Sequence, residues 1–117
     1  IMGEPISKEA CQKKLNGIND ALYAIGGKWK IKIIIAISEG YSRFNEIQRT
    51  LGISAKVLSM ELKDLELNGF IQRNIDPGPP VVIDYTTTQY SNSLDQVLAA
   101  LSNWGEQHRE KIRAERS

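Results

Sequence analysis

A pair of amphipathic helix patterns joined by a very short turn constrains the fold of this chain more than any other feature. Apolar residues recur at helical spacing on both sides of the turn, at Phe44, Ile47 and Leu51 and then at Leu58, Leu62 and Leu65. Gly52 and Ile53 separate the first pattern from Ser54, which can begin the second helix as its N-cap. Two helices joined by a turn of about three or four residues that contains glycine predict a helix-turn-helix.

Residues that start and stop helices mark the limits of both patterns. Ser42 is placed to cap the first helix, and Gly52 is placed to end it. The second helix should close at Gly69, where Phe70 can contact Leu65 in a Schellman ending. The sequence therefore predicts where each of the two helices begins and ends.

A β-hairpin is expected directly after the second helix, in the stretch "FIQRNIDPGPPVVIDYTTT". Pro77-Gly78 suits the two central positions of a type II turn, because proline presets φ and glycine accepts a positive φ. The run Val81–Thr87 is rich in the β-branched and aromatic residues that strands prefer. Pro79 and Pro80 cannot donate to a strand ladder, so we expect them at the tip or edge.

Helical patterns also precede this unit. In the first, Cys11, Leu15, Ile18 and Leu22 share one helical face, with Ser7 placed as N-cap and Gly26-Gly27 as the end. Gly17 weakens its middle, so one helix and two short helices both remain possible.

The apolar run 31–37 has two interpretations. Its β-branched residues fit a buried strand, whereas Trp29, Ile33 and Ile37 fall on one helical face and Gly40 suits the end of a helix. We favour the buried helix.

The predicted order of elements is four helices, a β-hairpin and a last helix from about Ser91 to Glu115. This order describes a mainly α (α+β) winged helix-turn-helix with a two-stranded wing and helical extensions at both ends. The 117 residues fit one domain, in which residues 16–90 form the core and residues 91–115 form a terminal helix.

Composition excludes several classes of protein. The net charge is +1, so a basic surface for nucleic acid must be local. No apolar run approaches the ~20 residues of a membrane-spanning helix, and the first residues lack the pattern of a secretory signal. A single cysteine excludes an internal disulfide framework and suits a reducing cytoplasm. We therefore expect a cytoplasmic protein with no membrane partner.

The first two turns of the second helix offer a polar, mildly basic face. A helix in the major groove places its N-terminal residues against base edges, while a wing lies along the backbone, where cations release condensed counterions. The residues expected to bind DNA are Lys28, Arg43, Ser54, Ala55, Lys56, Ser59, Met60, Lys63, Arg73 and Asn74. Glu61, Asp64 and Glu66 should turn away from phosphate. For this helix alone, a plain solvated face is an equally good interpretation.

Nothing in the sequence supports catalysis, a metal site or a cofactor. His108 is the only histidine, and it has neither the second ligand that a metal needs nor the partners of a catalytic triad. Cys11 is a candidate redox sensor because Lys13 and Lys14 follow it closely, although a small apolar residue on a helix stripe is the simpler interpretation.

The terminal helices carry more apolar surface than a small winged core needs. We expect a homodimer interface at Leu15, Leu94, Leu98, Leu101, Trp104, His108 and Ile112. Two-fold symmetry would then present two DNA-binding helices to an inverted-repeat operator, about one helical turn apart.

The stretch from "AIGGKW" to "GPPVVIDYTTT" resembles the HxlR-type transcriptional regulators, a branch of the MarR-like winged-helix proteins. The matching elements include Ile25-Gly26-Gly27-Lys28-Trp29, Gly52-Ile53-Ser54, Pro80, Tyr85 and Thr88. The resemblance implies a bacterial or archaeal cytoplasmic regulator that dimerises through its terminal helices and binds promoter DNA. By position, it places Lys56 on the recognition helix and Arg73 on the wing.

Two other functions stay open at this point. A winged-helix module that binds proteins instead of DNA fits the small net charge and the Glu61, Asp64 and Glu66 cluster. Control by a small molecule would need a pocket between the terminal helices and the core, for which Tyr23, Trp29 and Trp104 are candidate lining residues.

Overall fold

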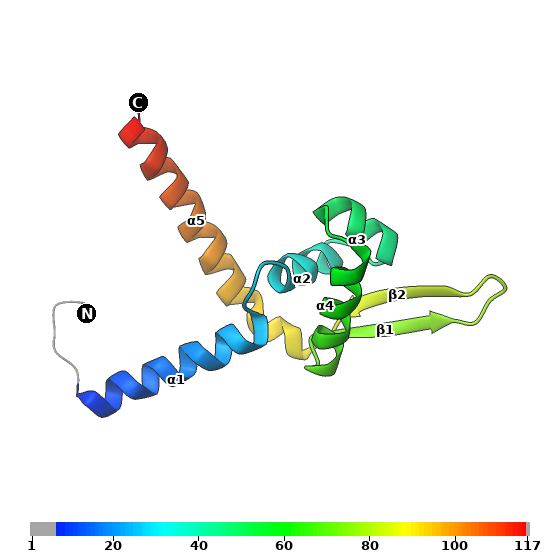
Figure 1. Ribbon diagram of the computed structural model, residues 1–117, viewed down its shortest axis with the longest axis horizontal. Helices are drawn as coiled ribbons and strands as arrows, with labels where there is room; N and C mark the ends of the chain where they lie inside the picture. Colours follow the sequence, from blue (N-terminus) through cyan, green and yellow to red (C-terminus); the bar gives the residue numbers. More distant parts are fainter. Residues whose placement is uncertain (1–6, 117) are drawn as a thin grey trace.

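The computed structural model describes residues 7–116 and has the predicted order of elements (Figure 1). The elements are α1 Lys8–Ile25, α2 Lys30–Ser38, α3 Phe44–Leu51, α4 Ala55–Leu67, β1 Ile71–Asp76, β2 Val82–Thr87, the 3-10 helix η1 Tyr90–Leu94 and α5 Asp95–Arg116. This order confirms the mainly α winged helix-turn-helix, in which α3 and α4 form the helix-turn-helix and the β-hairpin forms the wing. Gly17 does not interrupt α1, which is one continuous helix.

The apolar run 31–37 forms helix α2, as favoured over a strand. Its buried residues Ile33, Ile34 and Ile37 lie on neighbouring sides of the helix, because α3, α4 and β2 all pack around it. A helix covered by several elements is apolar around much of its circumference, which explains why periodicity alone left this run ambiguous.

The recognition helix α4 begins and ends as the sequence predicts. The Ser54 hydroxyl accepts a hydrogen bond from the Val57 N–H at 3.2 Å and so caps the helix. At the other end Gly69 has a φ of +83°, and the Phe70 N–H donates to the Leu65 carbonyl at 3.0 Å. This pair of features is the expected Schellman ending, and only glycine accepts that φ without strain.

The start of α3 differs from the prediction that Ser42 caps it. The N-cap is Arg43, whose N–H donates to the Glu46 carboxylate at 3.1 Å. The Ser42 carbonyl instead accepts the Tyr85 N–H at 2.8 Å. The carbonyl of an N-cap residue normally accepts the first hydrogen bond of the helix. In Ser42 this carbonyl is occupied by the wing strand, so Ser42 lies outside α3.

The wing is an antiparallel pair with Ile71 opposite Thr87 and Arg73 opposite Tyr85. The buried residues Ile71 and Tyr85 point to one face and join the core, while the neighbouring positions face solvent. Gly78, in the connecting turn, has a φ of +76°, consistent with the expected turn chemistry.

The core lies where α2, α3, α4 and the base of the wing meet. Its largest fully buried side chains are Ile33, Ile47, Leu58, Leu65 and Ile71. The last helix starts later than expected, because residues 90–94 form a 3-10 turn before α5.

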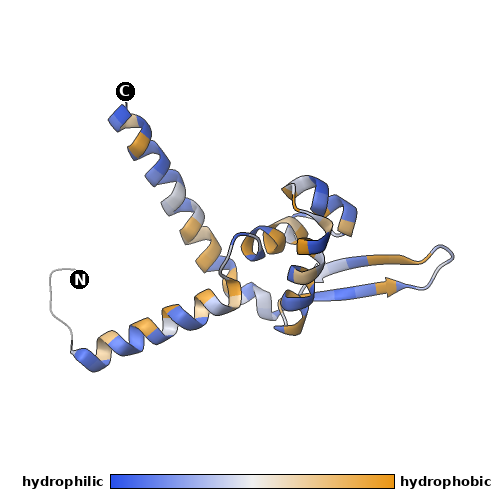
Figure 2. Ribbon diagram, viewed as in Figure 1, coloured by the Kyte–Doolittle hydropathy of each residue, from blue (hydrophilic) through white to orange (hydrophobic). Residues whose placement is uncertain are grey.

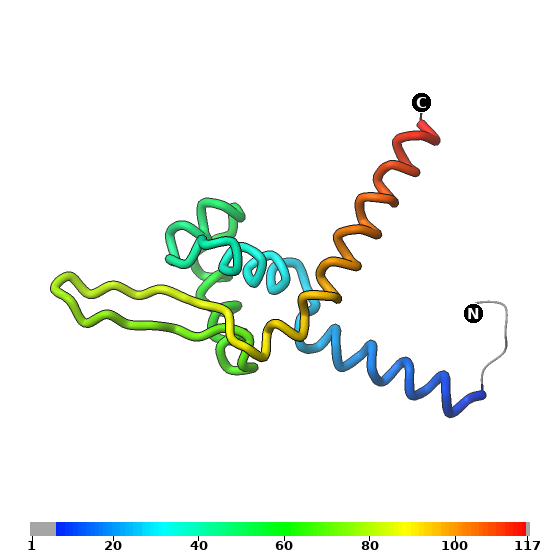
Figure 3. The backbone as a smooth tube through the Cα atoms, turned by 180° about the vertical axis from the view of Figure 1, so that it is seen from behind, coloured from blue at the N-terminus to red at the C-terminus, as the bar shows by residue number. Residues whose placement is uncertain are grey.

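Helices α1 and α5 leave the core on the side opposite the wing and diverge from each other (Figures 1 and 3). Colouring by hydropathy shows apolar residues recurring along both helices, far from the core (Figure 2). In α5 no residue is buried, and in α1 only Ile25 is buried. Within residues 7–116, no helix is both long and apolar enough to cross a membrane.

Candidate nucleic-acid interface

One side of α4 faces solvent, because Leu58, Leu62 and Leu65 hold the other side in the core. From its N-cap to Lys63, the exposed residues are Ser54, Ala55, Lys56, Ser59, Met60 and Lys63, which we call the outward face of α4. This set agrees with the sequence prediction. Within residues 7–116, Lys56 and Lys63 have no ion pair, so both ammonium groups are available to another molecule.

A hollow of about 510 Å³ separates α4 from the wing. Its lining residues are Phe44, Ser59, Leu62, Lys63, Glu66, Arg73, Ile83 and Tyr85. Arg73, which was expected on the wing, lies in the middle of β1, opposite Tyr85. The strand thereby brings Arg73 into the same hollow as Lys63 of α4, so that two cations line one concave surface.

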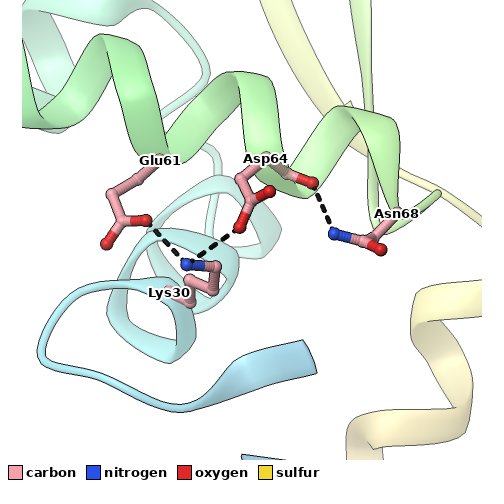
Figure 4. Close-up of polar contacts among 4 residues, drawn as sticks. All are labelled: Lys30, Glu61, Asp64 and Asn68. Atoms are coloured by element: carbon pink, nitrogen blue, oxygen red, sulfur yellow. Dashed lines mark hydrogen bonds and ion pairs between the residues drawn. The ribbon is translucent and has the colours of Figure 1, made fainter. Parts of the chain in front are cut away.

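Acidic side chains on α4 are held by α2 (Figure 4). The Lys30 ammonium lies 2.7 Å from the Glu61 carboxylate and 3.1 Å from that of Asp64. The hydrogen bond from Glu61 raises the pKa of Lys30 above its ordinary value of 10.5, with Asp64 contributing in the same direction and burial opposing it. Two of the three carboxylates expected to turn away from phosphate are therefore paired with α2. The third, Glu66, is exposed and lines the hollow together with Lys63 and Arg73, so it does not turn away from these cations.

Lys30 is the residue of this region that sequence reasoning missed. It lies 31 positions from Glu61, so no spacing rule links the two residues. Its neighbours Lys28 and Lys32 look equivalent in the sequence, yet their ammonium groups lie 4.9 and 5.3 Å from the centre of the Trp29 ring. Lys28, which was predicted to bind DNA, thus contacts Trp29 and does not line the hollow beside α4.

The wing carries little positive charge. Residues 71–87 contain one cation, Arg73, and two acidic residues, Asp76 and Asp84. Asn74, also predicted to bind DNA, donates through its amide nitrogen to Asp84 at 3.0 Å and to Thr86 at 3.1 Å. Only its amide oxygen is left for another donor.

Arg43, another predicted contact, is exposed beside the second strand of the wing. It lines one shallow groove with Val81, Val82 and Ile83, and another with Asp76 and Asp84. It is therefore separate from the hollow that holds Lys63 and Arg73.

The comparisons with known proteins agree with this geometry. The HxlR-like helix-turn-helix family matches residues 24–113. The chain belongs to this family. The HTH-type transcriptional regulator YybR of Bacillus subtilis (strain 168) is 30% identical over 112 residues, which cover 95% of this chain and 86% of YybR.

Solved structures place the HxlR-family fold among MarR-family regulators. A transcriptional regulator of the MarR family from Enterococcus faecalis V583 gives a TM-score of 0.74 at 33% identity, covering 86% of this chain and 93% of its own. The redox regulator HypR in its reduced form gives a TM-score of 0.76 at 28% identity, covering 84% of this chain and 98% of HypR. The chain is a DNA-binding transcriptional regulator, and a winged-helix module without DNA binding is not favoured.

The residues expected at a dimer interface have two kinds of surroundings in this HxlR-family chain. Leu94 and Leu98 pack partly against the core of their own chain. Leu15, Leu101 and Trp104 are 50%, 50% and 64% exposed. His108 is exposed and stacks on Trp104 with ring centroids 5.0 Å apart, while Ile112 is half-buried.

Two further candidates lie on the terminal helices. Cys11 is a free and exposed cysteine on α1. Tyr23, 88% exposed, and Trp104 do not enclose a buried site with Trp29, which packs against the core. Within residues 7–116, no cluster of three histidine, cysteine or acidic side chains is arranged to hold a metal ion.

Proposed function

We propose that this HxlR-family regulator binds promoter DNA sequence-specifically, with the N-terminal half of α4 in the major groove and Arg73 on the flanking backbone. The observation that carries the proposal is the outward face of α4, where Lys56 and Lys63 are unpaired while Lys30 restrains Glu61 and Asp64. In this arrangement the exposed charge of the first turns is positive although the whole chain is nearly neutral.

The residues that line the hollow support the same orientation. A phosphate ridge of the duplex would lie between Lys63 on one wall and Arg73 on the other, while Ser59 can donate from its hydroxyl group. The outward face of α4 would then reach base edges through Ala55, Lys56 and Met60.

We propose that the DNA-binding form is a homodimer assembled through α1 and α5. Both helices carry apolar residues that the chain itself leaves exposed, including Leu15, Leu101 and Trp104. Burial of such residues against a second copy removes apolar area from water. A two-fold dimer then favours an inverted repeat with half-sites about 10 base pairs apart.

Selection of bound duplexes from a random pool, at a stated salt concentration, tests this function. We expect an inverted repeat. Lys56→Ala should weaken binding of the selected duplex by about tenfold. Lys111→Ala is the matched control, because Lys111 pairs with Glu115 on the far end of α5. Equal affinity of both variants and the parent would refute the assignment of α4.

We propose that regulation needs neither enzymatic activity nor a cofactor, since the relatives are transcriptional regulators. Promoter DNA as the partner points to a cytoplasmic site of action.

A second candidate property is an oxidant signal through Cys11, because the similar protein HypR is a redox regulator and Cys11 is exposed. Operator affinity of oxidised and reduced protein should differ, and Cys11→Ser should abolish the difference.

A further inference from the structure

The direction in which α5 leaves the core is fixed over a very short stretch of chain. No residue of α5 is fully buried, and Leu98, in its first turn, packs only partly against the core. The connection to β2 consists of Thr88, Gln89 and the 3-10 turn η1. The orientation of α5 relative to the recognition helix is therefore set between Thr88 and Leu98, and Thr88 is the first residue of this segment.

Thr88 is bonded to the end of the recognition helix through both its backbone and its side chain. Its N–H donates to the Phe70 carbonyl at 3.3 Å, and its hydroxyl donates to the Gly69 carbonyl at 2.5 Å. Gly69 and Phe70 form the Schellman ending of α4. Thr88, at the end of the wing, is thus hydrogen-bonded to the two residues that end α4.

The same Thr88 hydroxyl also holds the start of η1. It accepts the Ser91 N–H at 3.2 Å, while the Ser91 hydroxyl donates to the Thr88 carbonyl at 2.6 Å. Ser91 is only 5% exposed. A buried hydroxyl with a partner at this distance is costly to displace, because an unpaired buried polar group loses its hydration without compensation.

An aromatic pair reinforces the connection. The ring of Tyr90 in η1 stacks on Phe70, with centroids 5.3 Å apart and an interplanar angle of 23°. Phe70 belongs to the core, whereas Tyr90 is 62% exposed. We call the set Gly69, Phe70, Thr88, Tyr90 and Ser91 the Thr88 junction.

We infer that the Thr88 junction sets the spacing between the two DNA-binding helices of the dimer, and with it the half-site spacing that the regulator accepts. This inference rests on the proposed homodimer. Thr88 and Ser91 are positioning residues: they act through the angle between α4 and α5, not through contact with DNA.

The length of α5 makes this angle matter. At 1.5 Å per residue, 22 helical residues form a lever of about 33 Å, so a rotation of about 10° at the junction moves its far end by about 6 Å. One base-pair step along B-DNA is about 3.4 Å. A small loss of rigidity at Thr88 is thus enough to remove the preference for one half-site spacing over a spacing that is one base pair longer or shorter.

The test uses full-length protein and duplexes that carry two copies of the selected half-site at spacings varied by one base pair. We expect the parent to show a sharp optimum, with affinity falling at least about tenfold two base pairs away. Thr88→Val removes the hydroxyl at nearly constant shape and should reduce that difference to about threefold. Affinity for a single half-site should stay within about twofold, because the outward face of α4 is unchanged.

Thr88→Ser keeps the hydroxyl and should restore the sharp optimum. If Thr88→Val fails to fold by circular dichroism, Ser91→Ala serves as the second variant, since it removes one bond of the junction and leaves the Thr88–Gly69 bond in place. An unchanged sharp optimum in the folded variant overturns the inference while leaving the proposed function intact. A monomeric parent with no spacing preference in the same series overturns the proposed dimer and the inference together.

Discussion

The same kind of apolar sequence pattern is buried in the winged core and exposed in the terminal helices. In α4 the apolar stripe includes Leu58 and Leu65, whose side chains are both 0% exposed. In α5 a similar stripe contains Leu101 and Trp104, which remain 50% and 64% exposed. The comparison teaches that periodicity identifies the apolar side of a helix, but not the surface that covers it. The rest of the same chain covers the apolar stripe of α4. We propose that a second copy of the chain covers the apolar stripe of α5.

The largest expected effect is on the core side of this comparison. Leu65→Ala should lower the free energy of unfolding by about 3 kcal/mol, because it removes a fully buried side chain and leaves a cavity. Urea denaturation measures the change. Leu67→Ala, two residues away in the same helix and 85% exposed, is the matched control and should change stability by less than about 0.5 kcal/mol. Equal losses in the two variants would contradict the packing of α4.

The next effect concerns the terminal helices. Trp104→Ser should raise the dimer dissociation constant by about 100-fold, since large aromatic residues dominate protein interfaces. Sedimentation equilibrium measures the constant. The fold of the winged core should be unaffected, because Trp104 contributes nothing to it. Gln107→Ser on the same helix is the control, and an equal response from both variants would place the interface elsewhere.

A smaller effect is expected where α4 faces the wing. Lys63→Ala and Arg73→Ala should each weaken operator binding, and each should flatten the plot of log affinity against log salt by about 0.9 if one phosphate contact is lost. Fluorescence anisotropy between low and moderate salt measures the slope. Asn74→Ala should leave the slope unchanged, because Asn74 is uncharged and bonded across the wing. If both variants gave the same slope as the parent, the hollow between α4 and the wing would not be part of the DNA interface.

The smallest effect concerns the ion pairs between α2 and α4. The pKa of Lys30 is raised by Glu61, so the stabilisation is fully present below pH 10.5 and is lost as the pH rises through the folded-state pKa. Lys30→Met lacks this contribution. Its stability curve should therefore converge with that of the parent above pH 10.5, from a difference of about 1 kcal/mol or less at lower pH. Curves that stay parallel to pH 12 would show that the pair does not contribute.

Much of the fold could be predicted because its determinants are local. Ser54 caps α4 and Gly69 ends it, and each acts through hydrogen bonds or backbone angles within a few residues. Ser42 was assigned wrongly because its carbonyl bonds to Tyr85, far along the chain. The outward face of α4 was predictable for the same local reason, since Leu58 and Leu62 fix which side is buried.

The sequence by itself determined the order of elements, the limits of the recognition helix and the apolar stripes of the terminal helices. Helix caps, positive-φ glycines and hydrophobic periodicity suffice for these, because they depend on neighbours within a turn or two. Only the tertiary structure decided that Lys30 restrains Glu61, that Arg73 shares a hollow with Lys63 and that Thr88 joins the end of α4 to α5. Each of these arrangements involves residues on different elements, so it exists only once packing has brought those elements together.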